Sequence, residues 1–166
     1  MKKPTKGKWM IEYRRLSLQS SETAEGVFRG VAVPYGELSH VLADRARPYR
    51  ERFERGAIKH TDSTVMIYNH NQGSLPLARV GAGTLRFTET DEGLRFEAEL
   101  PESATEIREA LQRGDMDGSV SIGFIASDDK WNNRTNPAVR TVQSAELIEL
   151  SVLSGAGAYA NAKGSF

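Results

Sequence analysis

Cysteine is absent from the 166 residues of this chain. Its absence excludes disulfide bonds, metal sites built from thiolates, and a thiol nucleophile. If the chain carries a nucleophile, the attacking atom must therefore be oxygen or nitrogen.

Long hydrophobic runs are missing as well. No apolar run approaches the roughly 18 residues that a membrane-spanning helix needs. The lysine-rich start of the chain has no apolar stretch behind it, as a signal peptide would have. We therefore expect a soluble protein that is not exported.

Neither sign of charge predominates, since 22 Lys and Arg residues balance 22 Asp and Glu residues. This balance gives no sign of a nucleic-acid partner. The phosphate-binding loop, the dinucleotide-binding Gly-x-Gly-x-x-Gly, the zinc-binding His-Glu-x-x-His and the Gly-x-Ser-x-Gly elbow of α/β-hydrolases are all missing. The sequence thus predicts no cofactor, no metal, and neither nucleic acid nor membrane as a partner.

The length and the 39% hydrophobic content suit one domain with one core. Residues 1–8 include four lysines, and residues 154–166 are mainly small residues without periodicity. We predict a folded domain over residues 9–153, between a flexible basic tail at 1–8 and a flexible small-residue tail at 154–166.

Strand-like patterns predominate between these tails. Residues 9–18 and 26–35 are rich in β-branched and aromatic side chains, and we expect these two segments to pair with each other. Further runs of strand length or alternating pattern cover residues 64–68, 79–87, 94–100, 119–126 and 139–153.

One helix is predicted over residues 103–113. Ser103 and Glu106 fit a capping box, an apolar stripe follows, and Gly114 ends the pattern. The fold class that these patterns predict is mostly β with a few short helices (α+β).

His70 is one of three histidines, and a general base that works near neutral pH is most often histidine. The other two, His40 and His60, have polar neighbours, so we expect them at the surface. His70 lies at the end of the predicted strand 64–68, where a rigid element would hold a catalytic group. The same place also suits a histidine that merely caps a strand end.

Ser121 lies in the predicted strand 119–126, with Gly123 two residues on and on the same face. The missing side chain at Gly123 leaves the space that a nucleophilic hydroxyl needs to approach a carbonyl carbon within about 3 to 3.5 Å. Ser119 shares that face, and a strand serine can also face solvent or bond to a neighbouring strand. Spacing alone leaves the choice open.

Glu149 interrupts an apolar segment of the predicted strand 139–153, where a buried carboxylate is costly without a partner. It is a candidate for the acid that orients a catalytic histidine. A glutamate on the wet face of an edge strand fits the same pattern. Asp115 and Asp117 lie nearer to Ser121 in sequence, but the glycines beside them indicate turn chemistry.

Three separated segments resemble, in the same order, the prohead maturation proteases of HK97-like tailed phages. Residues 69–71 (Asn-His-Asn) and 76–78 (Pro-Leu-Ala) are similar to the family's Asn-His-Asp segment and the Pro-(Leu/Ile)-Gly that follows it. Residues 117–124 (Asp-Gly-Ser-Val-Ser-Ile-Gly-Phe) resemble its Asp/Gly turn and Ser-x-Gly-Phe. Residues 147–151 (Leu-Ile-Glu-Leu-Ser) resemble its Leu-x-Glu-(Ile/Val)-Ser.

Weaker similarity extends the match to about residues 26–161. Residues 28–35 and 51–57 resemble the family's opening strand and its Glu-x-Phe-x-x-Gly-Ala turn. The chain departs from the family pattern at Asn71, where Asp is usual, and at Ala78, where Gly is usual. Its C-terminal tail is altered as well, since residues 155–159 (Gly-Ala-Gly-Ala-Tyr) stand where the family often has Pro-Ala-Tyr.

The resemblance implies roles for the candidate residues. It selects Ser121 over Ser119 as the nucleophile, and it places His70 as the base and Glu149 as the supporting acid. It also implies a fold like that of herpesvirus assemblins, a closed or nearly closed β-barrel.

The function that the resemblance implies is that of a serine endopeptidase of phage head maturation. Its substrates would be the scaffold segment of the major capsid protein and the protease itself, which makes the capsid protein and further copies of this chain the expected partners. Cleavage would take place inside the assembling prohead, in the cytoplasm of the bacterial host.

Two other readings use the same residues. Asn71 and the altered C-terminal tail also suit an inactive family member that acts as a capsid-assembly or scaffold module. A different hydrolase, such as an esterase, would use the same three residues on small activated esters and would have no capsid partner.

Overall fold

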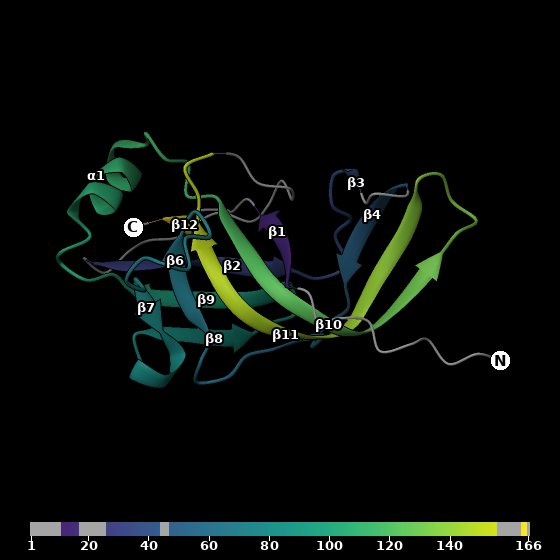
Figure 1. Cartoon of the computed structure of the whole chain (residues 1–166), viewed down its shortest axis with the longest axis horizontal. Coiled ribbons are helices and arrows are strands. Elements are labelled where there is room, and N and C mark those ends of the chain that lie inside the picture. The colour runs from purple at the N-terminus through teal and green to yellow at the C-terminus, as the bar shows by residue number, and fades with distance from the viewer. Residues whose placement is uncertain (1–10, 17–25, 44–46, 156–163, 166) are drawn as a thin grey trace.

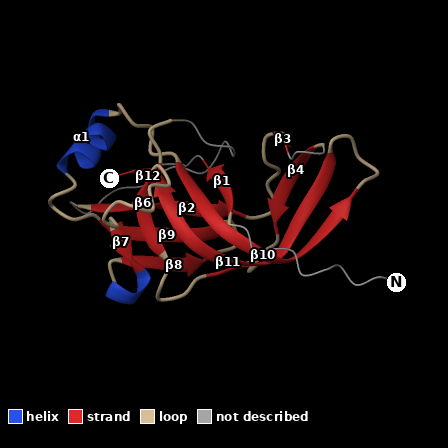
Figure 2. Cartoon of the chain, viewed as in Figure 1, coloured by secondary structure: helices blue, strands red, loops and turns tan. Residues whose placement is uncertain are grey.

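The computed structural model describes residues 11–16, 26–43, 47–155 and 164–165, and these residues form mainly β-strands (Figures 1 and 2). The only α-helix among them is α1 (Thr105–Arg113), and a short 3₁₀ helix covers Val80–Ala82. No helix in these segments is long and apolar enough to span a lipid bilayer. The predicted fold class, mostly β, is confirmed.

The larger of the two sheets is built around a long antiparallel hairpin of β10 and β11. Its strand order is β1-β10-β11-β4-β3, and β5 and β6 also pair with β11 in parallel, with β7 alongside β6. The strands of this sheet are β1 (Glu12–Leu16), β3 (Leu42–Ala43), β4 (Pro48–Phe53), β5 (Ile58–Lys59), β6 (Val65–Tyr68), β7 (Ala78–Arg79), β10 (Val120–Asn132) and β11 (Ala138–Val152).

The smaller sheet has the order β12-β2-β9-β8. Its strands are β2 (Val27–Pro34), β8 (Leu85–Glu89), β9 (Gly93–Glu99) and β12 (Gly164–Ser165). In Figure 1 these strands lie near β6 and β11, and α1 lies at the end of the molecule far from β3 and β4.

One hydrophobic core joins the two sheets. Phe28 of β2 packs against Phe96 of β9 with 5.4 Å between ring centroids, and Phe53 of β4 packs against Phe124 of β10 at 5.2 Å. All four rings are almost completely buried and belong to the same cluster of side chains. The alternation of apolar residues along these strands is what lets each sheet turn one face to this core.

The larger sheet is strongly curled, although strand pairing does not close it. Arg14 of β1 and Glu51 of β4 form a salt bridge with 2.7 Å between Nε and Oε1, yet β10 and β11 lie between their strands. Register shifts in the β10–β11 hairpin mark bulges, which bend strands. Among the described strands neither sheet closes on itself, so the expected closed or nearly closed barrel is not confirmed.

Several local predictions differ from the structure. The segments predicted at 9–18 and 26–35 do form β1 and β2, but β1 pairs with β10 and β2 pairs with β9 and β12, so their expected mutual pairing is wrong.

The helix prediction is correct in place but not in its capping. The residue that precedes α1 as its N-cap is Ala104, and no side chain caps the helix there, so the Ser103 and Glu106 capping box is wrong. Gly114 ends the helix in the left-handed conformation as expected. The predicted tail at residues 1–8 lies outside the described residues, as does most of the predicted tail at 154–166.

Candidate active site

His70 follows the end of β6 in a backbone conformation that few residues adopt. Asn69 and His70 have φ angles of 47° and 57°, in the left-handed region. The N–H of Asn69 donates to the carbonyl of Val152 at 2.9 Å, and this bond ties the turn after β6 to the end of β11. The end of β6 therefore fixes the position of the His70 backbone.

Glu149 lies in the middle of β11 and is completely buried. Its partner across the sheet is Gly123 of β10. A Cβ atom at Gly123 would lie 2.6 Å from Cγ of Glu149, closer than carbon atoms approach in proteins, and a tight 3.0 Å from Cε1 of Tyr13. The missing side chain at position 123 thus makes room for the glutamate, rather than leaving open space beside Ser121.

His70 and Glu149 are in direct contact, although 79 residues separate them in sequence. The Nδ1 atom of His70 meets Oε1 of Glu149, and the amide of Gln72 donates to Oε2 of the same carboxylate. The hydroxyl of Ser151 donates to Oε1 at 3.0 Å. Both carboxylate oxygens are therefore bonded, which satisfies a charge that would be costly to bury alone.

Ser121 lies on β10 directly opposite Ser151 of β11, two pairs along from Gly123 and Glu149. Directly opposed residues of an antiparallel pair point to the same face, so the Ser121 side chain shares its face with Glu149. The Ser121 hydroxyl is fully buried and makes no hydrogen bond within the described structure. The structure thus brings His70 and Glu149 into contact and places Ser121 beside them without a bond to His70.

Ser119 is buried too, and its hydroxyl is likewise without a hydrogen-bond partner among the described residues. It precedes β10, and its backbone accepts a hydrogen bond from the N–H of Leu153 at 2.9 Å. Ser121 lies two residues nearer to Gly123, which faces Glu149. Along the chain, Ser121 is therefore the closer of the two serines to the residue opposite Glu149.

Three residues of the site carried no functional prediction. Ser151 and Gln72 bind the Glu149 carboxylate, and the ring of Tyr13 stands edge-on to the His70 ring at 4.5 Å between centroids. Ser151 shares the alternating pattern of Glu149, which was a usable signal. Nothing in the sequence near Tyr13 or Gln72 points to His70.

The other candidates lie where the sequence predicted. His40 and His60 are exposed, and the His60 ring packs on Phe87. The carboxylate of Asp117 accepts a hydrogen bond from the N–H of Ser119 at 2.9 Å, which is turn chemistry. No group of three His, Asp or Glu side chains suited to a metal ion occurs in the described segments.

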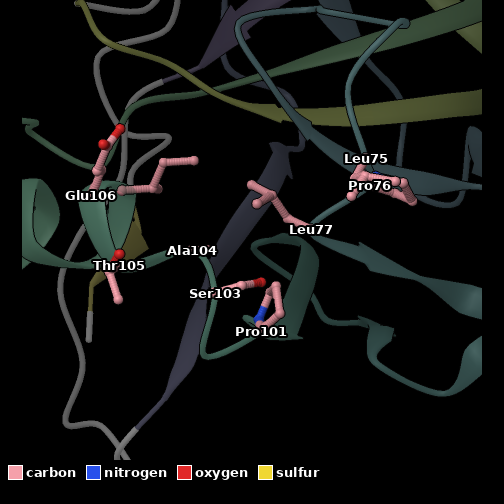
Figure 3. Close-up of a pocket in the computed structure, with 9 residues that line it drawn as sticks. Leu75, Pro76, Leu77, Pro101, Ser103, Ala104, Thr105 and Glu106 are labelled. Atoms are coloured by element: carbon pink, nitrogen blue, oxygen red, sulfur yellow. The ribbon is translucent and has the colours of Figure 1, made fainter.

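A groove of about 790 Å³ lies beside the segment that follows His70 (Figure 3). One side is formed by residues 75–77 and the other by the start of α1, and Leu75 at its rim is 90% exposed. Most of its lining is apolar, including Leu77 and Ile107. None of His70, Ser121 and Glu149 lines this groove.

A histidine held by a buried carboxylate, beside a serine on a neighbouring strand, is the kind of arrangement on which serine hydrolases are built. The comparison with protein families agrees, because residues 14–165 match the family described as caudovirus prohead serine protease. The chain belongs to this family. No curated protein and no solved structure matches the chain.

Proposed function

We propose that this chain is a serine endopeptidase of phage head maturation, with Ser121 as nucleophile, His70 as general base and Glu149 as the acid that orients the base. The contact between Nδ1 of His70 and the Glu149 carboxylate carries this proposal. It leaves Nε2 as the ring nitrogen that can take up a proton, in the manner of other hydrolytic triads.

In the proposed reaction, Nε2 of His70 accepts the hydroxyl proton of Ser121 while Oγ attacks the peptide carbonyl. The imidazolium formed is stabilised by Glu149 and then gives its proton to the leaving amine, which yields an acyl-enzyme. Water deacylates the enzyme by the same route, with His70 again as base. Serine, histidine and glutamate all return to their starting states.

This reaction requires a hydrogen bond from Ser121 to His70 that is not formed in the described structure. Catalytic hydrogen bonds are often long or absent without substrate and tighten when it binds. We therefore expect substrate binding to bring the Ser121 hydroxyl and Nε2 together.

By its family, the chain would act on the scaffold segment of the major capsid protein and on itself, inside the prohead and within the bacterial host cell. Residues 9–153 would form the protease domain, with residues 1–8 and 154–166 as tails. Self-cleavage would make a second copy of the chain a substrate.

Co-expression with the major capsid protein of the same phage tests the proposal. Wild-type chain should remove the scaffold segment, and Ser121→Ala should leave the capsid protein at full length while the variant still folds. Ser119→Ala is the matched control, because it removes a buried, unpaired hydroxyl two residues away. Cleavage by Ser121→Ala equal to that by wild type would overturn the assignment.

A scaffold module without activity is the second candidate, and the buried, unpaired hydroxyl of Ser121 favours it. Under this alternative, shells would assemble with wild type, Ser121→Ala and His70→Ala alike, and the capsid protein would stay at full length in all three. Gel analysis of purified shells separates the two candidates.

A further inference from the structure

The hydroxyl of Ser151 lies between the two residues of the His70–Glu149 pair and bonds to both. It accepts a hydrogen bond from the backbone N–H of His70 at 3.1 Å and donates one to Oε1 of Glu149 at 3.0 Å. Since His70 also contacts Oε1 through Nδ1, the three residues form a closed ring of interactions. The side chain of Ser151 is completely buried.

The backbone of His70 needs such support. Its φ of 57° lies in the left-handed region, which few residues other than glycine adopt, although Asn, Asp and His do so more often than the rest. Such conformations persist only where surrounding contacts hold them, and they cluster at functional sites. The bond from the His70 N–H to Ser151 is a contact of this kind, and it ties the turn to β11.

The Glu149 carboxylate is held in the same way. Ser151 and His70 bind one oxygen, and Gln72, two residues after His70, binds the other. A carboxylate with only one partner could rotate about its χ angles, but one bonded at both oxygens has a single orientation. His70 and Gln72 already bond both oxygens, and what Ser151 adds is a second link from Oε1 to the His70 backbone, which ties the acid to the base.

We infer that Ser151 is a positioning residue of this site, which couples the His70 backbone to the Glu149 carboxylate and so keeps Nδ1 engaged and Nε2 free for the nucleophile. Gln72 supports the same carboxylate from the opposite oxygen. The expected effect of Ser151 on the reaction rate rests on the proposed function, whereas its expected effect on the His70 ring does not.

Ser151→Ala removes both hydrogen bonds, and we expect it to lower kcat by about 10- to 100-fold with little change in KM. Ser151→Thr keeps the hydroxyl, and β-branched residues suit strands, so it should recover a large part of the rate. Ser119→Ala is the matched control, because the hydroxyl that it removes is equally buried but makes no hydrogen bond among the described residues.

Proton NMR of the His70 ring gives a readout that is independent of cleavage. In ¹⁵N-labelled wild type the Nδ1 proton, held by Glu149, should give a far-downfield signal that is lost in His70→Ala. The chain has only three histidines, and His40 and His60 are exposed, so the assignment is direct. Ser151→Ala should shift or broaden this signal, whereas Ser151→Thr and Ser119→Ala should retain it.

An unchanged Nδ1 signal in folded Ser151→Ala would overturn the inference, even if activity fell, because the hydroxyl would then be merely structural. If Ser151→Ala fails to fold, Ser151→Cys keeps the volume with a weaker donor and takes its place. If wild type cleaves nothing but the signal responds to Ser151 as described, the proposed function fails and the positioning role stands.

Discussion

Gly123 lies opposite Glu149, and the space above its Cα is already filled by the glutamate side chain. A methyl group there would meet Cγ of Glu149 at 2.6 Å, so Gly123→Ala must push the carboxylate or β10 aside. We expect a loss of about 1 to 3 kcal/mol in the free energy of unfolding, together with a loss of activity.

Urea unfolding and a cleavage assay measure the two effects. Gly155→Ala is the control, because no atom of the residues that the structure describes lies within 4 Å of a Cβ atom at that position. If both variants lose the same stability and activity, the close packing of Gly123 on Glu149 has no role in the site.

The charge of Glu149 is the second feature at the scale of single residues. Glu149→Gln keeps the shape of the side chain but replaces the carboxylate oxygen that meets Nδ1 with either a weaker acceptor or a donor. In hydrolytic triads this change leaves the histidine in the wrong tautomer, and we expect kcat to fall by roughly 10⁴-fold.

Steady-state kinetics on a peptide spanning the cleavage site of the capsid protein measures the effect. Glu146→Gln, on the same strand but exposed, should behave as wild type. A similar, small effect of both variants would show that the Glu149 carboxylate does not act on His70.

At the scale of elements, buried salt bridges hold β1 against the larger sheet, in addition to its pairing with β10. Arg14 and Arg140 both bind Glu51, which is completely buried on β4. Burial disfavours the Arg14 cation, but the Glu51 carboxylate outweighs this and raises the pKa of Arg14 above its usual value. Burial also raises the pKa of Glu51 above its usual value, against the opposing effect of Arg14 and Arg140, so the buried carboxylate depends on these two partners.

Removing the Glu51 carboxylate would take away the most deeply buried anion that both arginines bind, and it would leave them with Glu12 and, for Arg140, Asp129. We expect Glu51→Gln to lower the free energy of unfolding by about 3 kcal/mol or more, and to speed amide hydrogen exchange in β1. Because Tyr13 of β1 packs against the His70 ring, looser attachment of β1 should also disturb the site.

Urea unfolding and hydrogen exchange followed by mass spectrometry test this expectation. The control is Glu99→Gln, which breaks an exposed ion pair with Arg86 and should cost within about 1 kcal/mol. Equal costs for the two variants would contradict a structural role for the buried cluster.

At the scale of the whole molecule, the sequence predicts the elements better than their partners. Alternation places most of the predicted strands, and the apolar stripe with Gly114 places the helix, within a few residues, whereas the capping box does not form. The pairing of β1 with β10 joins segments more than a hundred residues apart, and no local pattern carries that information.

For the candidate site too, the sequence predicts the residues better than the contacts between them. His70 and Glu149 could be proposed from residue type and motif order, but their contact depends on β6 pairing in parallel with β11, with Tyr68 beside Val152. Gln72 could not be assigned from the sequence, because its role lies in its distance to one carboxylate, and for Ser151 the sequence offers only a place on the same face as Glu149. The sequence also could not predict that the larger sheet curls without closing, because closure depends on bulges and on contacts between edge strands.

The most direct test of the central claim is to label the purified chain with a fluorophosphonate and to map the modified residue by mass spectrometry. The account predicts a single adduct on Ser121 in wild type and in Ser119→Ala, and none in Ser121→Ala or His70→Ala. An adduct that persists in Ser121→Ala, or a folded wild-type chain that stays unlabelled even inside assembled proheads, would contradict it.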